Sequence, residues 1–330
     1  MAKDQNNQGE MSEKKGIKSY IVHLVIAAVL VGIVALVVVR LNIWSHRTTT
    51  VEKIYEVGEL KSESQDNIVY RDPAKPFREP DGVTRAVIFG NYMVDNYGKD
   101  KSIINMLKEN FDWEFIDLSV DATCIAQHSQ AGEERELFDN FCLFKMVEYI
   151  LTGTKSDYQK YAPFYREVDK DAFVEKWRSV DFNKVDKVII MYSLMDYYYI
   201  NRRTGENDET SVFGSLFKTI QTLQAAYPHL EIILSSGYPE YIIKDDGTVE
   251  YGYTSYYGGT GMDDENYGTQ SMYAQIEAYV ALSTLVTYID NFYCGINEEN
   301  IHDYVDQQNL TDAGIELIGN HIVDVLKRME

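Results

Sequence analysis

From residue 85 onward, short apolar runs alternate with stretches whose apolar residues recur at helical spacing. Strands buried on both faces are continuously apolar, and parallel strands need long crossovers that are usually helices. The alternation therefore predicts an α/β fold with an open, mainly parallel, five-stranded sheet and helices on both faces. The expected strands are residues 86–89, 113–118, 185–192, 231–235 and 287–290.

Helices are expected between and after these strands. Thr311 is expected to cap the last of them, because a threonine hydroxyl can accept hydrogen bonds from the first helical turn. An Asp-Gly turn at Asp246 predicts a small hairpin over residues 242–250. Ligands of open α/β sheets bind beyond the carboxyl ends of the strands, so residues there are the first candidates for a site. The expected helices are residues 102–110, 133–151, 171–180, 213–226, 272–285 and 312–327.

Residues 20–39 form an apolar run of Ile, Val, Leu, Ala and Gly that contains His23. The length of this run matches the roughly 30 Å hydrocarbon core of a bilayer, so it predicts one membrane span. A cleaved signal peptide is the alternative, but the run is longer than a usual signal and no small-residue cleavage site follows it. Lysines just before the run favour a cytoplasmic N-terminus. We expect an uncleaved anchor.

These features divide the chain into four predicted parts. They are a cytoplasmic tail (1–19), a transmembrane anchor (20–39), a proline-containing stalk (40–82) and a folded domain (83–330). The expected protein is a single-pass protein of the cell membrane, with the C-terminal domain extracellular. The net charge of −21 excludes a nucleic-acid partner, because binding of phosphates needs a basic surface.

Cys124, Cys142 and Cys294 are too few for a disulfide framework, and none lies in a CxxC pair. Each is expected to be a small buried hydrophobe. Outside the cell, one disulfide with one remaining thiol is an alternative, and the spacing does not select the pair.

Four motifs carry the chemical information. They are Gly90-Asn91-Tyr92, residues 119–123, Ser193-Leu194-Met195-Asp196 and residues 306–309. Over residues 83–330 their order and spacing resemble the SGNH (GDSL-type) hydrolases, which implies an SGNH hydrolase-like, flavodoxin-like fold. That family cleaves esters with a serine after the first strand, a glycine after the second, an asparagine after the third, and a histidine three residues beyond an aspartate.

All four of these positions differ in this sequence. The resemblance puts Tyr92 at the serine, Ala122 at the glycine, Met195 at the asparagine and Asn309 at the histidine, and it retains Asp306. A thioether cannot donate to an oxyanion, and an amide cannot shuttle a proton near pH 7. The loss of one triad member typically costs about four orders of magnitude in rate. We therefore expect a hydrolase framework with no intact catalytic site.

Tyrosines are frequent at the same expected edge and can stack on sugars while bonding to their hydroxyls. The alternative is that they fill space between helices and sheet. Carboxylates such as Asp95, Asp196 and Asp306, with Asp263 and Asp264, could attract a cation, but their spacing matches no known metal loop. No metal or cofactor is therefore expected. The candidate binding residues are Asn91, Tyr92, Asp95, Asp196, Tyr197, Tyr253, Tyr256 and Tyr257.

Residues 212–216, 226–228 and 291–297 are similar to membrane-anchored SGNH-like proteins of Gram-positive bacteria, which implies a role at the cell surface. The favoured function is an inactive SGNH hydrolase-like protein that binds cell-surface polysaccharide or assists its assembly or modification. One alternative is an active esterase, acyltransferase or deacetylase on acylated envelope glycans, with Ser193 and His302 as displaced nucleophile and base. Another is a scaffold whose membrane span packs against other helices through small residues.

Overall fold

The computed structural model describes His23 and residues 64–70, 78–96, 98–127, 141–152, 170–199, 201–205, 208–255 and 267–330. The chain divides into two compact units, residues 1–58 and 59–330. Within these described ranges, no helix is long and apolar enough to cross a membrane. The predicted anchor over residues 20–39 lies outside them, apart from His23, and stays a prediction. The second unit is described below.

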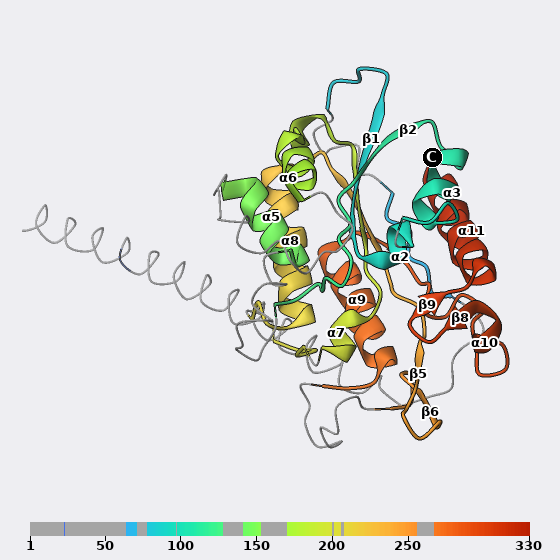
Figure 1. Cartoon of the computed structure of the whole chain (residues 1–330). Coiled ribbons are helices and arrows are strands. Elements are labelled where there is room, and N and C mark those ends of the chain that lie inside the picture. The colour runs from blue at the N-terminus through green and yellow to red at the C-terminus, as the bar shows by residue number, and fades with distance from the viewer. Residues whose placement is uncertain are drawn as a thin grey trace, which may run out of the picture. The chain divides into compact units, whose positions relative to one another are not determined.

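The second unit is built on a five-stranded parallel sheet in the order β2-β1-β3-β4-β7 (Figure 1). This confirms the predicted α/β fold class and its five strands, with small shifts in the strand boundaries. Because the order reverses between β1 and β3, the loops after these two strands diverge; the region between these loops, here called the crevice, is where ligands of open sheets usually bind. The strands are β1 (Thr84–Gly90), β2 (Trp113–Asp117), β3 (Lys187–Met191), β4 (Glu231–Ser235) and β7 (Thr287–Ile289).

The central strands are apolar on both faces because helices cover both faces. Val188, Ile189 and Ile190 of β3 are all completely buried, as are Val87 and Ile88 of the neighbouring β1. A strand with one solvated face would alternate apolar and polar residues instead. The continuous apolar runs in the sequence were therefore a direct signal of this architecture.

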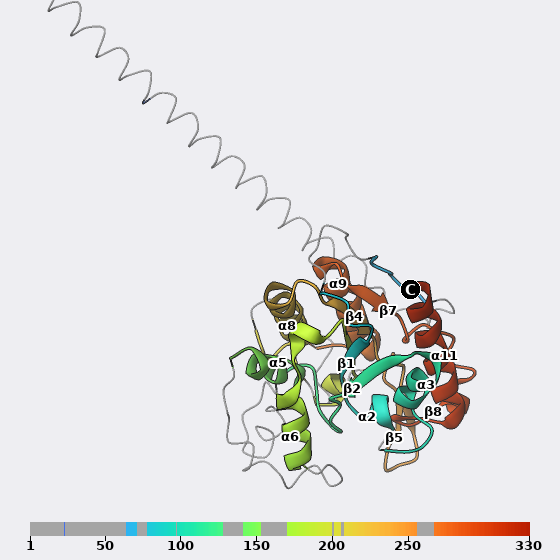
Figure 2. The same cartoon turned by 90° about the horizontal axis from the view of Figure 1, so that it is seen from above.

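The larger helices form two layers (Figures 1 and 2). α5, α6 and α8 lie on one side of the sheet, and α3 and α11 lie on the other. α9 packs beside α8, where the rings of Phe213 and Tyr279 stack with centroids 5.7 Å apart. These helices are α3 (Ile103–Asn110), α5 (Leu143–Thr152), α6 (Lys170–Ser179), α8 (Val212–Ala226), α9 (Gln270–Thr284) and α11 (Asp312–Arg328).

Local signals placed two of these details correctly. The hydroxyl of Thr311 accepts a hydrogen bond from the Gly314 N–H at 3.1 Å, which confirms the predicted cap of α11. The predicted hairpin is confirmed as β5 (Tyr241–Ile243) paired with β6 (Val249–Tyr251). Most of the first half of the predicted helix over 133–151 lies outside the described residues, and α5 begins at Leu143.

Several short elements had no clear sequence signal. They are α2 (Tyr92–Asp95), η2 (Phe182–Lys184), α7 (Met195–Tyr198), α10 (Ile301–Tyr304), and the hairpin of β8 (Val305–Asp306) and β9 (Asn309–Leu310). Elements of two to four residues contain too few positions to show a periodicity. Two of them, α2 and α7, directly follow β1 and β3 and shape the candidate site.

Residues 64–70, here named the edge strap, run along the outer side of β7. Asn67 and Tyr288 exchange backbone hydrogen bonds of 2.9 and 2.8 Å in an antiparallel bridge. The sequence assigned this segment to the stalk, whereas the structure packs it onto the sheet. The strap satisfies backbone groups that an edge strand would otherwise leave open to another chain.

Asp66 fastens the edge strap. Its carboxylate accepts hydrogen bonds from the backbone N–H of Asp290 at 3.0 Å and from Arg328 at 3.0 Å, and His321 Nε2 lies 3.1 Å from it. Burial raises the pKa of Asp66, but the hydrogen bonds from His321, Asp290 and Arg328 outweigh this effect and leave it lowered. The ionised carboxylate is therefore the form that stabilises the strap.

We expect Asp66→Asn to lower the free energy of unfolding by about 1–2 kcal/mol at pH 7, because these donors lose a charged acceptor at a partly exposed site. The contribution of a carboxylate with a lowered pKa is present above its unfolded value of 3.8 and is lost as pH falls through the folded value. Urea denaturation at pH 7 and pH 3 should therefore show the difference shrinking in acid. Asp324→Asn, at an exposed position of the same helix as His321, is the control. Equal loss in both variants would contradict this role.

Candidate functional site

The candidate site lies at the carboxyl ends of β1 and β3, where the strand order reverses. β1 ends at Gly90, and a Cβ atom there would lie 2.3 Å from the Met191 carbonyl oxygen. Only glycine allows the two strand ends to approach this closely. Asn91 and Tyr92 follow on one side of the crevice, and the residues after Met191 follow on the other.

Asn91 joins the three loops after β1, β2 and β3. Its amide nitrogen donates to the Thr123 carbonyl at 3.2 Å and to the Ser193 hydroxyl at 3.1 Å. Its amide oxygen accepts from the backbone N–H groups of Ser193 at 3.0 Å and Met93 at 3.3 Å. The side chain is completely buried. Asn91, a candidate binding residue, thus acts as a brace within the protein.

Tyr92 and Met195 meet in the crevice. The Tyr92 hydroxyl donates to the Met195 sulfur at 3.6 Å, and the two side chains form a small apolar cluster with Cys124. Tyr92 is 4% exposed and Met195 is 8% exposed. The residues aligned with the nucleophile and with the oxyanion donor therefore touch each other and occupy the space between them.

Ala122, two residues before Cys124, has a left-handed backbone with φ 55°. This conformation suits glycine and strains a residue with a Cβ atom. The backbone therefore retains the shape that glycine favours at the position where the motif comparison places a glycine.

We expect Ala122→Gly to be neutral or to stabilise the protein, by up to about 1 kcal/mol, because it removes this strain. Ala126→Gly is the matched control, and it should destabilise the protein because Ala126 is buried and has no positive φ. Chemical denaturation of the three proteins gives the comparison. A clear loss of stability in Ala122→Gly would contradict the inferred strain.

Asn309 and Asp306 lie opposite each other in the β8–β9 hairpin. The hairpin is held to the segment after β4, because the Tyr238 hydroxyl donates to the Gln308 carbonyl at 2.9 Å and the Tyr241 N–H donates to the Gln307 carbonyl at 3.2 Å. Asn309 is half-buried and Asp306 is exposed. Tyr92 and Met195 thus meet directly and Ala122 lies two residues before Cys124 of their cluster, whereas Asn309 lies in a hairpin that is hydrogen-bonded to the segment after β4.

Glu240, in this segment after β4, belongs to the site although nothing in the sequence singled it out. It is completely buried, and Gln270 Nε2 lies 3.4 Å from its carboxyl group. Burial raises the pKa of Glu240 well above its usual value, and hydrogen bonds from Tyr198, the Leu194 N–H, Gln270 and Tyr92 offset this only in part. The raised pKa makes the carboxylate form of Glu240, which a general base for Tyr92 would need, less available than in a solvent-exposed glutamate.

Asp196 also has a structural role rather than a ligand-binding one. It is 2% exposed and accepts hydrogen bonds from the N–H groups of Ile125 at 2.8 Å and Ala126 at 3.0 Å, and from the Asn201 amide at 2.8 Å. These bonds fix the loop after β2 against α7. Because its oxygens already accept these bonds, Asp196 is not positioned to hold a cation at the mouth of the crevice.

The tyrosines expected to line a glycan cleft are mostly packed inside the protein. Tyr197 and Tyr253 are buried, and the Tyr197 hydroxyl donates to the Ser255 carbonyl at 2.8 Å. Tyr256 and Tyr257 lie outside the described residues. A buried ring offers no face to a sugar, so the structure favours the space-filling interpretation for Tyr197 and Tyr253. Asp95 is half-buried at the end of α2.

The alternative pair, Ser193 and His302, does not form a couple. Ser193 is buried and its hydroxyl accepts from Asn91, whereas His302 is exposed and its Nε2 lies 3.1 Å from the Tyr251 hydroxyl. The other histidines described in the second unit also have partners that are not serines. His229 faces backbone carbonyls, and His321 faces Asn291 and Asp66.

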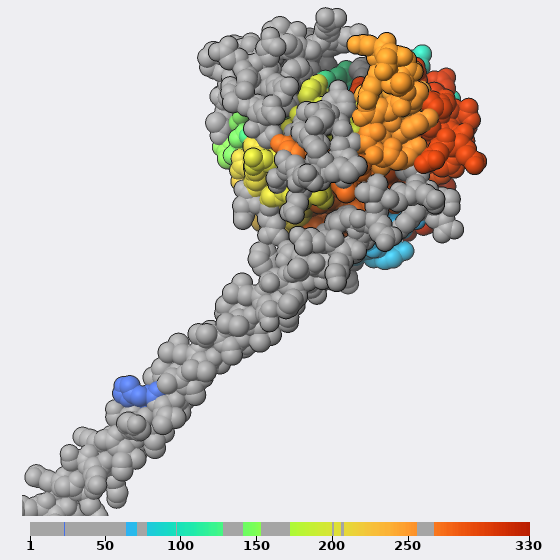
Figure 3. Space-filling model, turned by 90° about the horizontal axis from the view of Figure 1, so that it is seen from below, coloured from blue at the N-terminus to red at the C-terminus, as the bar shows by residue number. Residues whose placement is uncertain are grey.

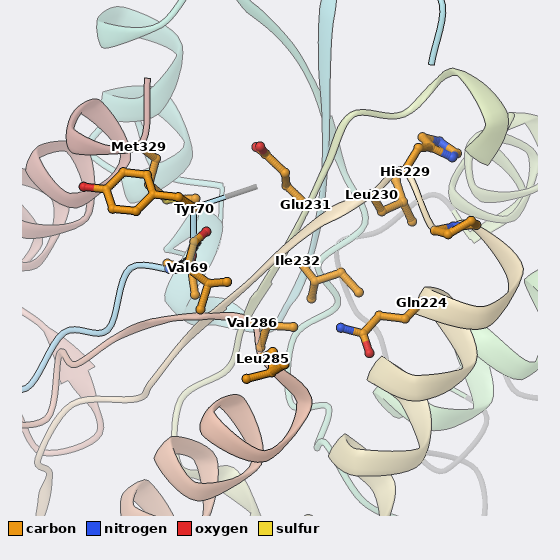
Figure 4. A pocket seen from close by; sticks show the side chains of 12 residues that line it. Val69, Tyr70, Gln224, His229, Leu230, Glu231, Ile232, Leu285, Val286 and Met329 are labelled. Carbon is orange, nitrogen blue, oxygen red and sulfur yellow. Dashed lines mark hydrogen bonds between the residues drawn. The ribbon is translucent and has the colours of Figure 1, made fainter. Parts of the chain in front are cut away.

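Among the described residues, no group of three His, Cys, Asp or Glu side chains is arranged to hold a metal ion. A pocket of about 160 Å³ lies at the opposite, amino end of β4 and β7. Figure 4 shows it between Tyr70 of the edge strap, Leu285 after α9 and Gln224 of α8, with Ile232 at its centre. It is therefore separate from the candidate site.

No protein-family model matches the chain, and a search of curated proteins finds no match. Solved structures with a similar fold do exist. They include a protein from Lactobacillus plantarum, with 15% identity, a TM-score of 0.48, and coverage of 75% of this chain and 98% of the other. A possible lipase from Chitinophaga pinensis has 12% identity, a TM-score of 0.46, and coverage of 74% and 98%.

A member of the lipolytic G-D-S-L family from Veillonella parvula has 13% identity, a TM-score of 0.43, and coverage of 74% of this chain and all (100%) of the other. Of these three neighbours, one is thus described as a possible lipase and one as a member of the lipolytic G-D-S-L family. Identities this low concern the fold alone, so the interpretation of the site rests on the contacts described above.

Proposed function

We propose that this chain is a catalytically inactive SGNH hydrolase-like protein, anchored in the cell membrane, which binds cell-surface polysaccharide and assists its assembly or modification. The proposed membrane anchor is based on the apolar run of residues 20–39. The proposed polysaccharide ligand is based on the resemblance to surface proteins of Gram-positive bacteria. The single observation that supports inactivity is the contact of 3.6 Å between the Tyr92 hydroxyl and the Met195 sulfur. It fills the place where an ester carbonyl and its oxyanion donor would have to meet.

The chemistry around this contact supports the same proposal. A phenol would need a base to become a nucleophile, and burial disfavours the ionised form of the nearby acid Glu240 by raising its pKa. Asn309, at the position of the histidine, can neither take up nor return a proton. The cluster therefore lacks both an activated nucleophile and a proton shuttle.

A binding surface for the polysaccharide is proposed on the β5–β6 hairpin. The ring of His302 lies 4.5 Å from that of Tyr241 and 6.0 Å from that of Tyr251. Figure 3 shows this hairpin beside the chain around α10, on the outer surface of the molecule. His302 is exposed and Tyr251 is half-buried, so their rings can reach a sugar without unfolding of the site.

Binding to an O-acetylated bacterial cell-wall polysaccharide, and to the same material after mild alkaline deacetylation, tests this proposal. Sedimentation with the insoluble polysaccharide should show binding by the purified full-length chain, without release of acetate. Tyr251→Ala should reduce this binding several-fold, whereas Tyr70→Ala, at an exposed tyrosine near the amino ends of β4 and β7, should not. Because the net charge is −21, neutral chains should bind better than polyanions.

Release of acetate that depends on the folded chain would instead support the esterase alternative. Absence of binding to either polysaccharide, or equal loss in Tyr251→Ala and Tyr70→Ala, would overturn the proposed surface.

A further inference from the structure

Two of the three cysteines come together at the wall of the candidate site. Cys124 follows β2, and Cys142 directly precedes α5; both are buried. The Leu143 N–H donates to the Cys124 carbonyl at 3.1 Å, so the backbones of the two cysteine segments are in direct contact. The sequence could not select a disulfide pair, but this contact does.

The backbone contact limits the distance between the two residues. Standard bond lengths place each Cα atom about 2.4 Å from the atom of its own peptide group that makes this hydrogen bond. The two Cα atoms therefore lie within roughly 8 Å of each other, so a small approach of the two segments would bring them into the range of about 4.4–6.8 Å that disulfides span. Both thiols are close enough to the buried Tyr192, which directly follows β3, to act electrostatically on its hydroxyl.

Cys294 does not compete for either partner. It follows β7 and lies near Asp290 and Asp66, at the edge of the sheet covered by the strap. β2, which Cys124 follows, is at the other edge. Burial raises the pKa of Cys294 to about 12, so little of it is in the reactive thiolate form.

We propose that Cys124 and Cys142 form an intramolecular disulfide when the chain meets an oxidising pool of small disulfides. The S–S bond forms as the two thiols lose two protons and two electrons, and one molecule of oxidised glutathione is reduced to two thiols. This inference does not depend on the ligand of the proposed function.

The bond would also affect the candidate site. Cys124 packs against Tyr92 and Met195, and its loop carries Ala122. The following residues of this loop donate the N–H bonds that Asp196 accepts. Oxidation would therefore tie one wall of the crevice to α5.

The experiment uses the purified full-length chain, reduced and then equilibrated with oxidised glutathione. Denaturation in excess N-ethylmaleimide and digestion should yield one alkylated cysteine, Cys294, and a linked peptide that joins Cys124 to Cys142. The reduced chain should yield three alkylated cysteines. The oxidised form should melt roughly 5–10 °C higher, because the cross-link restricts the unfolded chain.

Cys294→Ala is the matched control and should keep the cross-link, whereas Cys142→Ser should lose it. The wild-type peptide analysis does not depend on any variant folding. Three alkylated cysteines after oxidation, glutathione adducts in place of the linked peptide, or a link that includes Cys294 would each overturn the proposal.

Discussion

Replacing Asp196 with alanine is expected to lower the free energy of unfolding by about 3–5 kcal/mol, because each buried donor left without an acceptor costs about 1–3 kcal/mol. The carboxylate is almost completely buried and accepts from Ile125, Ala126 and Asn201. In Asp196→Ala these three donors would remain in the core without an acceptor. Urea denaturation followed by circular dichroism measures the loss.

Two variants make this prediction specific. Asp196→Asn keeps the shape but replaces one acceptor by a donor, so it should cost less than alanine and still be clearly destabilising. Asp306→Ala removes the exposed aspartate that the motif resemblance retains, and it should change stability by no more than about 0.5 kcal/mol. If Asp196→Ala were as stable as Asp306→Ala, Asp196 would not hold the loop after β2.

The second large effect concerns pH and two buried acids, Glu240 and Glu277. Burial raises the pKa of each well above the usual value of 4.5. For Glu277, the charges of Asp196 and Asp290 raise it further, and a backbone hydrogen bond from Gly237 lowers it. The folded state therefore holds these protons more tightly than the unfolded state.

Because of this difference, the two acids lower the free energy of unfolding at high pH. Between the unfolded and folded pKa values the unfolded chain binds fewer protons, so stability falls as pH rises from about 4.5 upward. The double variant Glu240→Gln/Glu277→Gln removes both titrating groups and keeps their shape. Its stability relative to wild type should therefore rise as pH increases above 4.5 and level off once pH passes the folded pKa values, as measured by urea denaturation at a series of pH values.

Glu299→Gln, at an exposed position, is the control and should follow the wild-type curve. Parallel curves for the double variant and the wild type would mean that the two acids do not titrate abnormally. A double variant that is less stable by the same amount at every pH would show lost packing instead.

The sheet was predictable because its signals are local. Each core strand is a short apolar run, such as Val188 to Ile190, and each run is followed by a helical pattern of sufficient length. The edge strap was not predictable, because its pairing partner Tyr288 lies more than two hundred residues further along the chain. The same holds for the β8–β9 hairpin, which is too short to show alternation.

At the candidate site, the sequence indicated which residues to consider, but it did not indicate how deeply their side chains are buried. The motifs pointed to Tyr92 and Met195, which contact each other in the structure, and to Ala122, which has a positive φ. They could not show that Tyr197 is buried, because exposure of a tyrosine depends on helices far along the chain. Glu240 was missed for the same reason, since a single glutamate carries no sign of its burial.

The most direct test of the account is the rate at which the purified full-length chain hydrolyses p-nitrophenyl acetate. We predict that the wild type, Tyr92→Phe and Ser193→Ala all hydrolyse it at the same background rate as an equal amount of heat-denatured chain. This result follows from the Tyr92–Met195 contact, the raised pKa of Glu240 and the absence of a histidine at position 309. Saturable turnover by the wild type that either substitution abolishes would contradict the account.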